Sequence, residues 1–202
     1  MQVSQSWRTP NMRKTLTALA LALGFASAVH AQDPMQFQAH LVGGDLFGNV
    51  IATPATGEAK FEVIQHATGQ AVKFKLEVEG LRNLFMAHIH VAPVGPVANN
   101  QPVGPIAFWF VPTVPGVPDS NIAAVLDDRL SDGFVMTNAQ MVGPLAFDPA
   151  NRMTTGIAGL IKAIHEGRAT IVVHTSDLDN TNNKTPGVAG DSPAGELRGL
   201  IQ

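Results

Sequence analysis

The sequence predicts a mainly β fold: an antiparallel β-sandwich or barrel of about seven or eight strands with one amphipathic helix. Apolar and polar residues alternate over several short segments, which is typical of strands with one buried face. Turns that contain Gly or Pro separate these segments at hairpin-like spacing. One segment alone spaces its apolar residues as a helix does.

The clearest strand pattern lies at residues 71–80, where four apolar residues alternate with Lys and Glu. Because side chains alternate across a strand, this segment is expected to have one buried face and one wet face. Residues 35–42 and 57–64 repeat the pattern. The first half of the domain is therefore predicted to be an antiparallel meander.

Further strands are predicted at residues 84–91, 106–111, 169–175 and 196–201, with a weaker candidate at 134–136. Residues 155–168 instead carry apolar residues at helical spacing, with Gly167 where a helix normally ends. We expect one helix there.

Two stretches rich in Pro and Gly, at residues 92–105 and 112–132, are expected to be long loops, the second with a short helix at 122–129. Long loops in a compact domain carry function or cover its surface.

Residues 1–31 have the three-part pattern of a secretory signal peptide. Basic residues and no acids flank an apolar run at 16–25, and the segment ends in Val-His-Ala. The run is shorter than the roughly 20 residues that cross a bilayer as a helix. We expect cleavage after Ala31, no membrane span, and a single exported domain at 32–202, periplasmic or extracellular.

Composition narrows the function classes. The signal segment carries three of the 13 basic residues and none of the 16 acidic ones, so the net charge changes from −3 to about −6 on its removal. No basic cluster remains that could neutralise a row of phosphates, so no nucleic-acid partner is expected. The absence of Cys excludes disulfides, thiolate metal sites and thiol catalysis. No catalytic signature was found, and a non-enzymatic role is favoured.

Histidines are the only group of side chains whose spacing in the sequence predicts a shared chemical site. His88 and His90 alternate along a predicted strand and so leave the same face, about 6.6 to 6.8 Å apart along the strand. His174, at the end of another apolar strand, is a candidate third ligand. Glu196 is a weaker candidate, because Arg198 on the same face is its more ordinary partner.

Without thiolates, a site of His or of His and carboxylate favours copper or zinc. Ligand nitrogens about 2.0–2.1 Å from a metal require the three imidazoles to converge within about 4 Å around an open position. The alternative is a buried, hydrogen-bonded cluster of histidines without metal. The acidic segment 177–183 resembles only the opening of a calcium loop, and we interpret it as a solvated turn.

Two motifs, Ala87-His88-Ile89-His90 and Gly195-Glu196-Leu197-Arg198-Gly199, are the most distinctive of a series that runs in order from about residue 35 to the C-terminus. Together they resemble the CHRD domain, which is named for the extracellular growth-factor antagonist chordin and also occurs as a single exported domain in bacteria. The resemblance implies an exported β-rich domain of poorly defined biochemistry. Residues 44–51 depart from the family pattern, and 111–130 are extra length.

Two hypotheses follow. The first is an exported binding or structural module that engages an unknown protein or another envelope partner, with the three histidines as a hydrogen-bonded cluster. The second is an envelope metal-binding protein for copper or zinc, with redox chemistry as an option. The sequence leaves the oligomeric state open.

Overall fold

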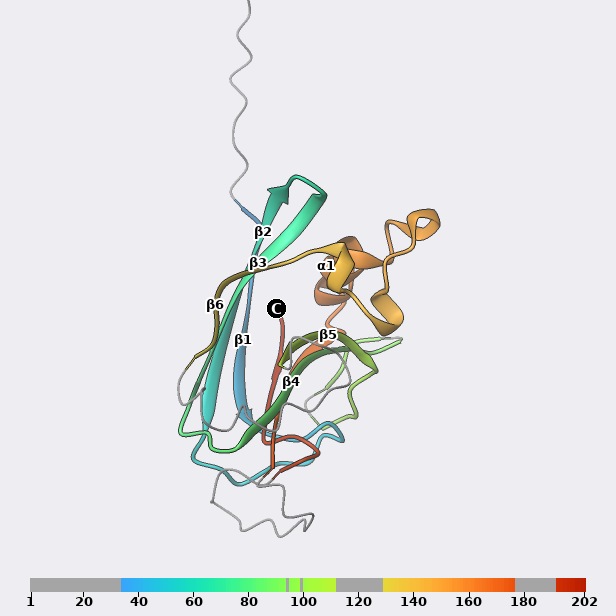
Figure 1. The fold of residues 1–202 in the computed structure, drawn as a ribbon. Coiled ribbons are helices and arrows are strands. Elements are labelled where there is room, and N and C mark those ends of the chain that lie inside the picture. Colours follow the sequence, from blue (N-terminus) through green and yellow to red (C-terminus); the bar gives the residue numbers. More distant parts are fainter. Residues whose placement is uncertain (1–33, 94, 99, 112–128, 177–191) are drawn as a thin grey trace, which may run out of the picture. The chain divides into compact units, whose positions relative to one another are not determined.

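The computed structural model describes residues 34–93, 95–98, 100–111, 129–176 and 192–202. They belong to a compact unit at 33–202, and the expected signal peptide lies outside the described residues. The elements, in chain order, are β1 (Gln36–Gly43), β2 (Thr56–His66), β3 (Gly69–Glu79), β4 (Leu84–Val91), β5 (Ile106–Val111), β6 (Arg129–Met136), α1 (Gly156–His165), β7 (Ala169–Thr175) and β8 (Leu197–Leu200) (Figure 1). Three short 3₁₀ turns, Asn138–Gln140, Gly143–Leu145 and Pro149–Asn151, lie between β6 and α1.

These strands form one sheet in the order β5-β4-β7-β8-β1-β2-β3-β6, and neighbouring strands run antiparallel. The predicted fold class is confirmed: the fold is mainly β and antiparallel, with eight strands and one α-helix in the described part of the chain. The meander of β1, β2 and β3 is also present.

The main difference from prediction is β6, which begins at Arg129 and not near residue 134. Residues 129–133 lack a clear alternation of apolar and polar types, and their pairing with β3 contains two register irregularities. A bulged strand of this kind has no period-2 signature. The short helix expected at 122–129 lies outside the described residues, except that Arg129 is in a strand.

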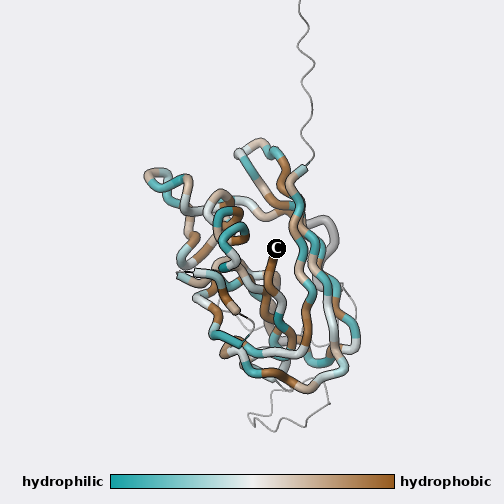
Figure 2. The backbone as a smooth tube through the Cα atoms, turned by 180° about the vertical axis from the view of Figure 1, so that it is seen from behind, coloured by the Kyte–Doolittle hydropathy of each residue, from teal (hydrophilic) through white to brown (hydrophobic). Residues whose placement is uncertain are grey.

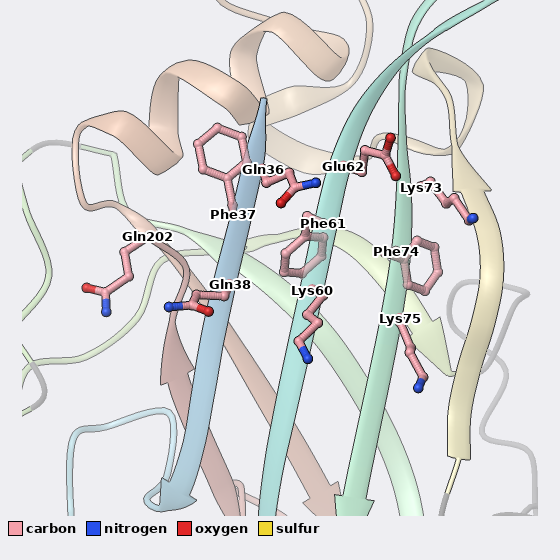
Figure 3. A pocket seen from close by; sticks show the side chains of 10 residues that line it. All are labelled: Gln36, Phe37, Gln38, Lys60, Phe61, Glu62, Lys73, Phe74, Lys75 and Gln202. Atoms are coloured by element: carbon pink, nitrogen blue, oxygen red, sulfur yellow. The ribbon is translucent and has the colours of Figure 1, made fainter. Parts of the chain in front are cut away.

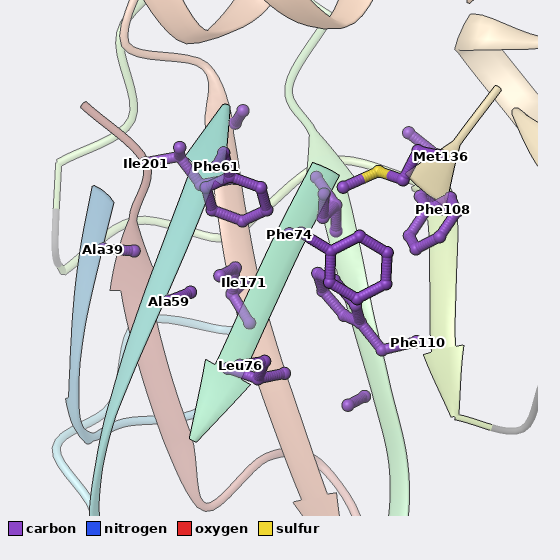
Figure 4. Close-up of a cluster of buried hydrophobic side chains, with 14 of the residues drawn as sticks. Ala39, Ala59, Phe61, Phe74, Leu76, Phe108, Phe110, Met136, Ile171 and Ile201 are labelled. Carbon is purple, nitrogen blue, oxygen red and sulfur yellow. The ribbon is translucent and has the colours of Figure 1, made fainter. Parts of the chain in front are cut away.

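The sheet curls until strands from its two ends pack against each other. In a flat sheet, β3 and β5 would lie about 29 Å apart, six strand spacings. The ring centroid of Phe74 on β3 instead lies 5.6 Å from that of Phe108 and 5.0 Å from that of Phe110, both on β5. The curled sheet thus encloses the hydrophobic core that Figure 4 shows.

Register explains how the core is filled. Phe37, Phe61 and Phe74 are directly paired across β1, β2 and β3, so one row of the sheet presents three aromatic rings to the interior. Along β1 exposed and buried residues alternate, and Figure 2 shows the same alternation of hydrophilic and hydrophobic residues along the chain. Period-2 patterning is therefore sufficient to orient these strands.

Helix α1 packs its apolar stripe against the same core. Ile157, Leu160 and Ile164 are buried, whereas Ile161 is only partly buried. The chain leaves the helix through Gly167, whose φ of 66° is the left-handed conformation that favours glycine. None of the helices in the described residues has the length and apolar content needed to cross a membrane.

We predict that Leu160→Ala lowers the free energy of unfolding by about 2–5 kcal/mol, because it leaves a cavity in the core. Ile161→Ala on the next, half-buried position is the matched control and should cost clearly less. Urea denaturation of both variants measures the difference. Equal losses would show that the helix does not pack through the face described.

Candidate metal centre

Strands β4 and β7 bring three histidines to one face of the sheet. In the antiparallel register Met86 pairs with His174, His88 with Val172 and His90 with Thr170. Directly paired residues share a face, so the three imidazoles lie on the same side. The residues that alternate with them, such as Ile89 and Val173, point into the core. The histidines therefore occupy the outer face of the curled sheet.

Despite this outer position, the exposed fractions of His88, His90 and His174 are 1%, 6% and 2%. Loops cover them. The Nδ1 of His90 lies 2.8 Å from the carbonyl oxygen of Gly104, and that of His174 lies 2.9 Å from the carbonyl oxygen of Pro193. Gly104 belongs to the long loop expected at 92–105, so a described residue of this loop lies against the site.

Gly104 can approach this closely because it has no side chain. A Cβ at this position would lie 2.0 Å from the carbonyl oxygen of Val91, a severe clash with backbone. The glycine thereby brings its own carbonyl to His90.

The hydrogen bonds assign the tautomers. A carbonyl oxygen only accepts, so Nδ1 of both His90 and His174 carries the proton and Nε2 carries a lone pair. The Nε2 of His174 lies 3.2 Å from Nδ1 of His88, which must then donate. Within the described residues, the buried Nε2 atoms of His88 and His90 have no hydrogen-bond partner.

One ligand nitrogen from each of the three rings can be chosen so that all lie within 4.8 Å of one another. This separation is slightly wider than the expected 4 Å. Nitrogens around a trigonal or tetrahedral metal lie about 3.3–3.6 Å apart, so binding requires the rings to close by roughly 1 Å. With this closure, the three neutral imidazoles would be suited to hold one metal ion.

A family model for the CHRD domain matches residues 37–181. The chain belongs to the CHRD domain family. The match includes all three histidines and the strands that carry them. Neither the curated proteins nor the solved structures contain a match to the chain. Membership supports a binding or structural module in general terms, and the resemblance to this family is confirmed.

In this CHRD domain the histidines are held neutral. Burial lowers the pKa of His88 to about 2, and repulsion by His174 and His90 adds to the effect. Burial also lowers the pKa of His174 to about 4, against the bond to Pro193. The pKa of His90 is lowered by burial and by the nearby Arg198 guanidinium. At neutral pH no proton has to be displaced before a metal binds.

Glu196 is buried at the edge of the same region, but its carboxylate has other partners. The hydroxyl groups of Thr53 and Thr175 donate to it at 2.5 Å and 2.6 Å. The group of residues with converging ligand atoms consists of the three histidines and does not include Glu196.

Arg198, expected as the partner of Glu196, donates to backbone oxygens. Its guanidinium bonds the carbonyls of Asp45, Ala98 and Gln101. These acceptors lie in two loops far apart in sequence, so one side chain on β8 ties both loops over the outer face. Arg198 is thus a structural clamp beside the histidines, a role that its sequence neighbours do not indicate.

Two further residues at the site were not singled out by sequence. Trp109 on β5 pairs with His88, and the ring centroids lie 4.1 Å apart in edge-to-face geometry. Thr170, opposite His90, is buried, and its hydroxyl has no partner in the described part of the chain. Strand pairing alone places these two residues at the histidine site, and no local sequence pattern indicates their position.

Figure 3 shows a separate groove of about 490 Å³ over β1, β2 and β3. Its lining includes none of the three histidines. Two of its lysines, Lys60 and Lys75, pair with Glu58 and Glu77 at 3.3 Å and 2.7 Å, and all four side chains are at least one-third exposed. Exposed pairs of this kind are typical of a solvated sheet face. None of the residues that line the groove belongs to the group of converging ligand atoms.

The lowered pKa values predict acid sensitivity of the metal-free protein. Below pH 6.5 the unfolded chain takes up protons at His88 and His174, whereas the folded chain resists protonation down to pH about 4 or lower. Stability is therefore full above pH 6.5 and falls as the pH decreases. Between pH 7 and pH 5 we expect a loss of about 2 kcal/mol per histidine, measured by urea denaturation.

His88→Gln should reduce this pH dependence, because it removes one of the buried histidines whose pKa values are lowered. A wild-type free energy of unfolding that is equal at pH 7 and pH 5 would contradict the assignment.

Proposed function

We propose that this protein is an exported CHRD-domain metal-binding protein that holds one copper or zinc ion on His88, His90 and His174. The observation that carries the proposal is the convergence of three buried, neutral imidazoles, two of which have an Nε2 atom without a partner in the described residues. A metal ion is the ligand that these lone pairs fit.

The alternative of a purely hydrogen-bonded cluster explains less. A buried acceptor without a partner costs about 1–3 kcal/mol, and the site contains two such atoms. In a cluster built for hydrogen bonding, these atoms would face donors. A metal ion bound to them would remove that cost.

The surroundings of the rings also support metal binding. The carbonyls of Gly104 and Pro193 accept from the Nδ1 atoms of His90 and His174, which fixes each ring with its lone pair on the opposite nitrogen. The His174 lone pair accepts from Nδ1 of His88 in the metal-free protein, so binding a metal at His174 requires that this hydrogen bond break. Metal-ligating histidines in proteins are usually oriented by this kind of second hydrogen bond. Copper and zinc are the expected ions, since the group offers imidazole nitrogen and no thiolate.

A role in binding a macromolecular partner is a second candidate. Phe47 and Val50, in the loop next to the site, are 57% and 91% exposed. Contiguous exposed apolar surface marks a contact site, and these two side chains belong to one loop. Metal binding and partner binding are compatible, because the first uses buried side chains and the second uses exposed ones.

Metal retention tests the proposal. The chain, purified without a His tag, is loaded with copper or zinc, dialysed, and analysed for metal content. We expect about one ion per chain, because the three histidines form a single site. His88→Ala should lose the ion, and His66→Ala, an exposed histidine outside the site, should retain it.

The melting temperature of each metal-free variant establishes that it is folded, and His90→Gln serves as a second, milder change at the site. A folded wild-type protein that retains neither ion would refute the proposal.

Export is proposed from the N-terminal pattern of residues 1–31 alone. When the full chain is expressed in a bacterial host, we expect envelope protein whose mass corresponds to residues 32–202. Ala31→Arg should leave the precursor uncleaved, because the processing site requires a small residue. Wild-type protein found only in the cytoplasm at full-length mass would contradict export.

A further inference from the structure

Met86 lies beside two of the three histidines, His88 and His174. It precedes His88 by two residues on β4, so both side chains leave the same face, and it pairs directly with His174 on β7. The Cβ atoms of directly opposed residues in antiparallel strands are about 4.5–5.5 Å apart. The side chain of Met86 is half-buried, and three flexible bonds allow its thioether to turn toward either histidine.

The donors on this face are electrically neutral. The ligand group contains three imidazoles and no carboxylate, and the buried Glu196 carboxylate accepts from two hydroxyls. The cationic Arg198 pairs with Val172, the residue that also pairs with His88. Burying an ion without an anionic ligand is costly, and the cost rises steeply with its charge. A monovalent ion therefore fits this face better than a divalent one.

The chemical softness of the ligands also favours a monovalent ion, copper(I). Thioether sulfur is a soft ligand that selects copper(I), while imidazole accepts copper and zinc alike. Trp109, with its ring 4.1 Å from that of His88, adds an apolar wall and no hard oxygen donor. The donors on this face are thus the buried histidine nitrogens and the Met86 thioether, beside a single oxygen without a partner in the described residues, the Thr170 hydroxyl.

We infer that the site is selective for copper(I), with Met86 as a thioether ligand beside His88, His90 and His174. This inference rests on the proposed function and adds to it the identity of the ion and a fourth ligand.

The test compares Met86→Leu with the wild type. Leucine keeps the size and apolar character of the side chain and removes the sulfur. Copper(I) affinity is measured without oxygen, by competition with a coloured copper(I) chelator, and zinc affinity is measured in parallel. The matched control is Met153→Leu, since Met153 is 78% exposed.

We expect Met86→Leu to weaken copper(I) binding by on the order of tenfold and to leave zinc binding unchanged. Met153→Leu should change neither. X-ray absorption of the copper(I)-loaded wild type should show a sulfur neighbour that is missing in Met86→Leu. Equal melting temperatures of the metal-free proteins establish that the variant is folded.

The possible outcomes distinguish failure of the Met86 inference from failure of the proposed three-histidine metal site. Copper(I) bound without a sulfur neighbour, or equally tightly by Met86→Leu, would overturn the role of Met86 and leave the three-histidine site standing. An equal loss of copper(I) and zinc in Met86→Leu would show a structural effect and also overturn it. Failure of the wild type to bind either ion would overturn both.

Discussion

The pairing of β4 with β7 is the constraint on which the rest of the domain depends. These strands are buried on both faces: one face supplies Ile89, Ile171 and Val173 to the core, and the other carries the histidines. A sheet region covered on both sides needs a second layer. Here the second layer consists of loops, because helix α1 packs against the core side.

The loop layer supplies the polar groups around the histidines, although the protein has few charged side chains. Loops bring backbone carbonyls, and carbonyls from residues 104 and 193 are what orient two of the imidazoles. Arg198 holds the same layer by donating to three other carbonyls, so a single cation both satisfies buried backbone and closes the cover. One face of β4 and β7 thus contributes to the core, and the opposite face of the same two strands carries the histidines.

Local patterns were sufficient for most of the fold, since alternation in β1 to β3, β-prone residues in β4 and β5, and helical spacing at α1 each extend over several residues. Local patterns also identified the three histidines. His88 and His90 belong to one His-Ile-His tripeptide, and His174 lies at the end of a predicted strand. Neither the adjacency of β4 and β7 nor the bulged start of β6 has a local signal. The bonds from Arg198 to the carbonyls at 45, 98 and 101 were not predicted for the same reason, because these acceptors are remote in sequence. Long-range pairing and loop docking decide such contacts, and no periodicity encodes them.

The position of Arg198 on β8 has a consequence for how the site is enclosed. β8 inserts between β7 and β1, so it joins the histidine strands β4 and β7 to the meander of β1, β2 and β3. Arg198 lies on β8 and donates to the carbonyls of Asp45, Ala98 and Gln101, so it ties these loops over the outer face only when β8 is paired. Completion of the sheet and enclosure of the histidines are therefore one event, and a domain in which β8 is detached loses the Arg198 tie over its imidazoles.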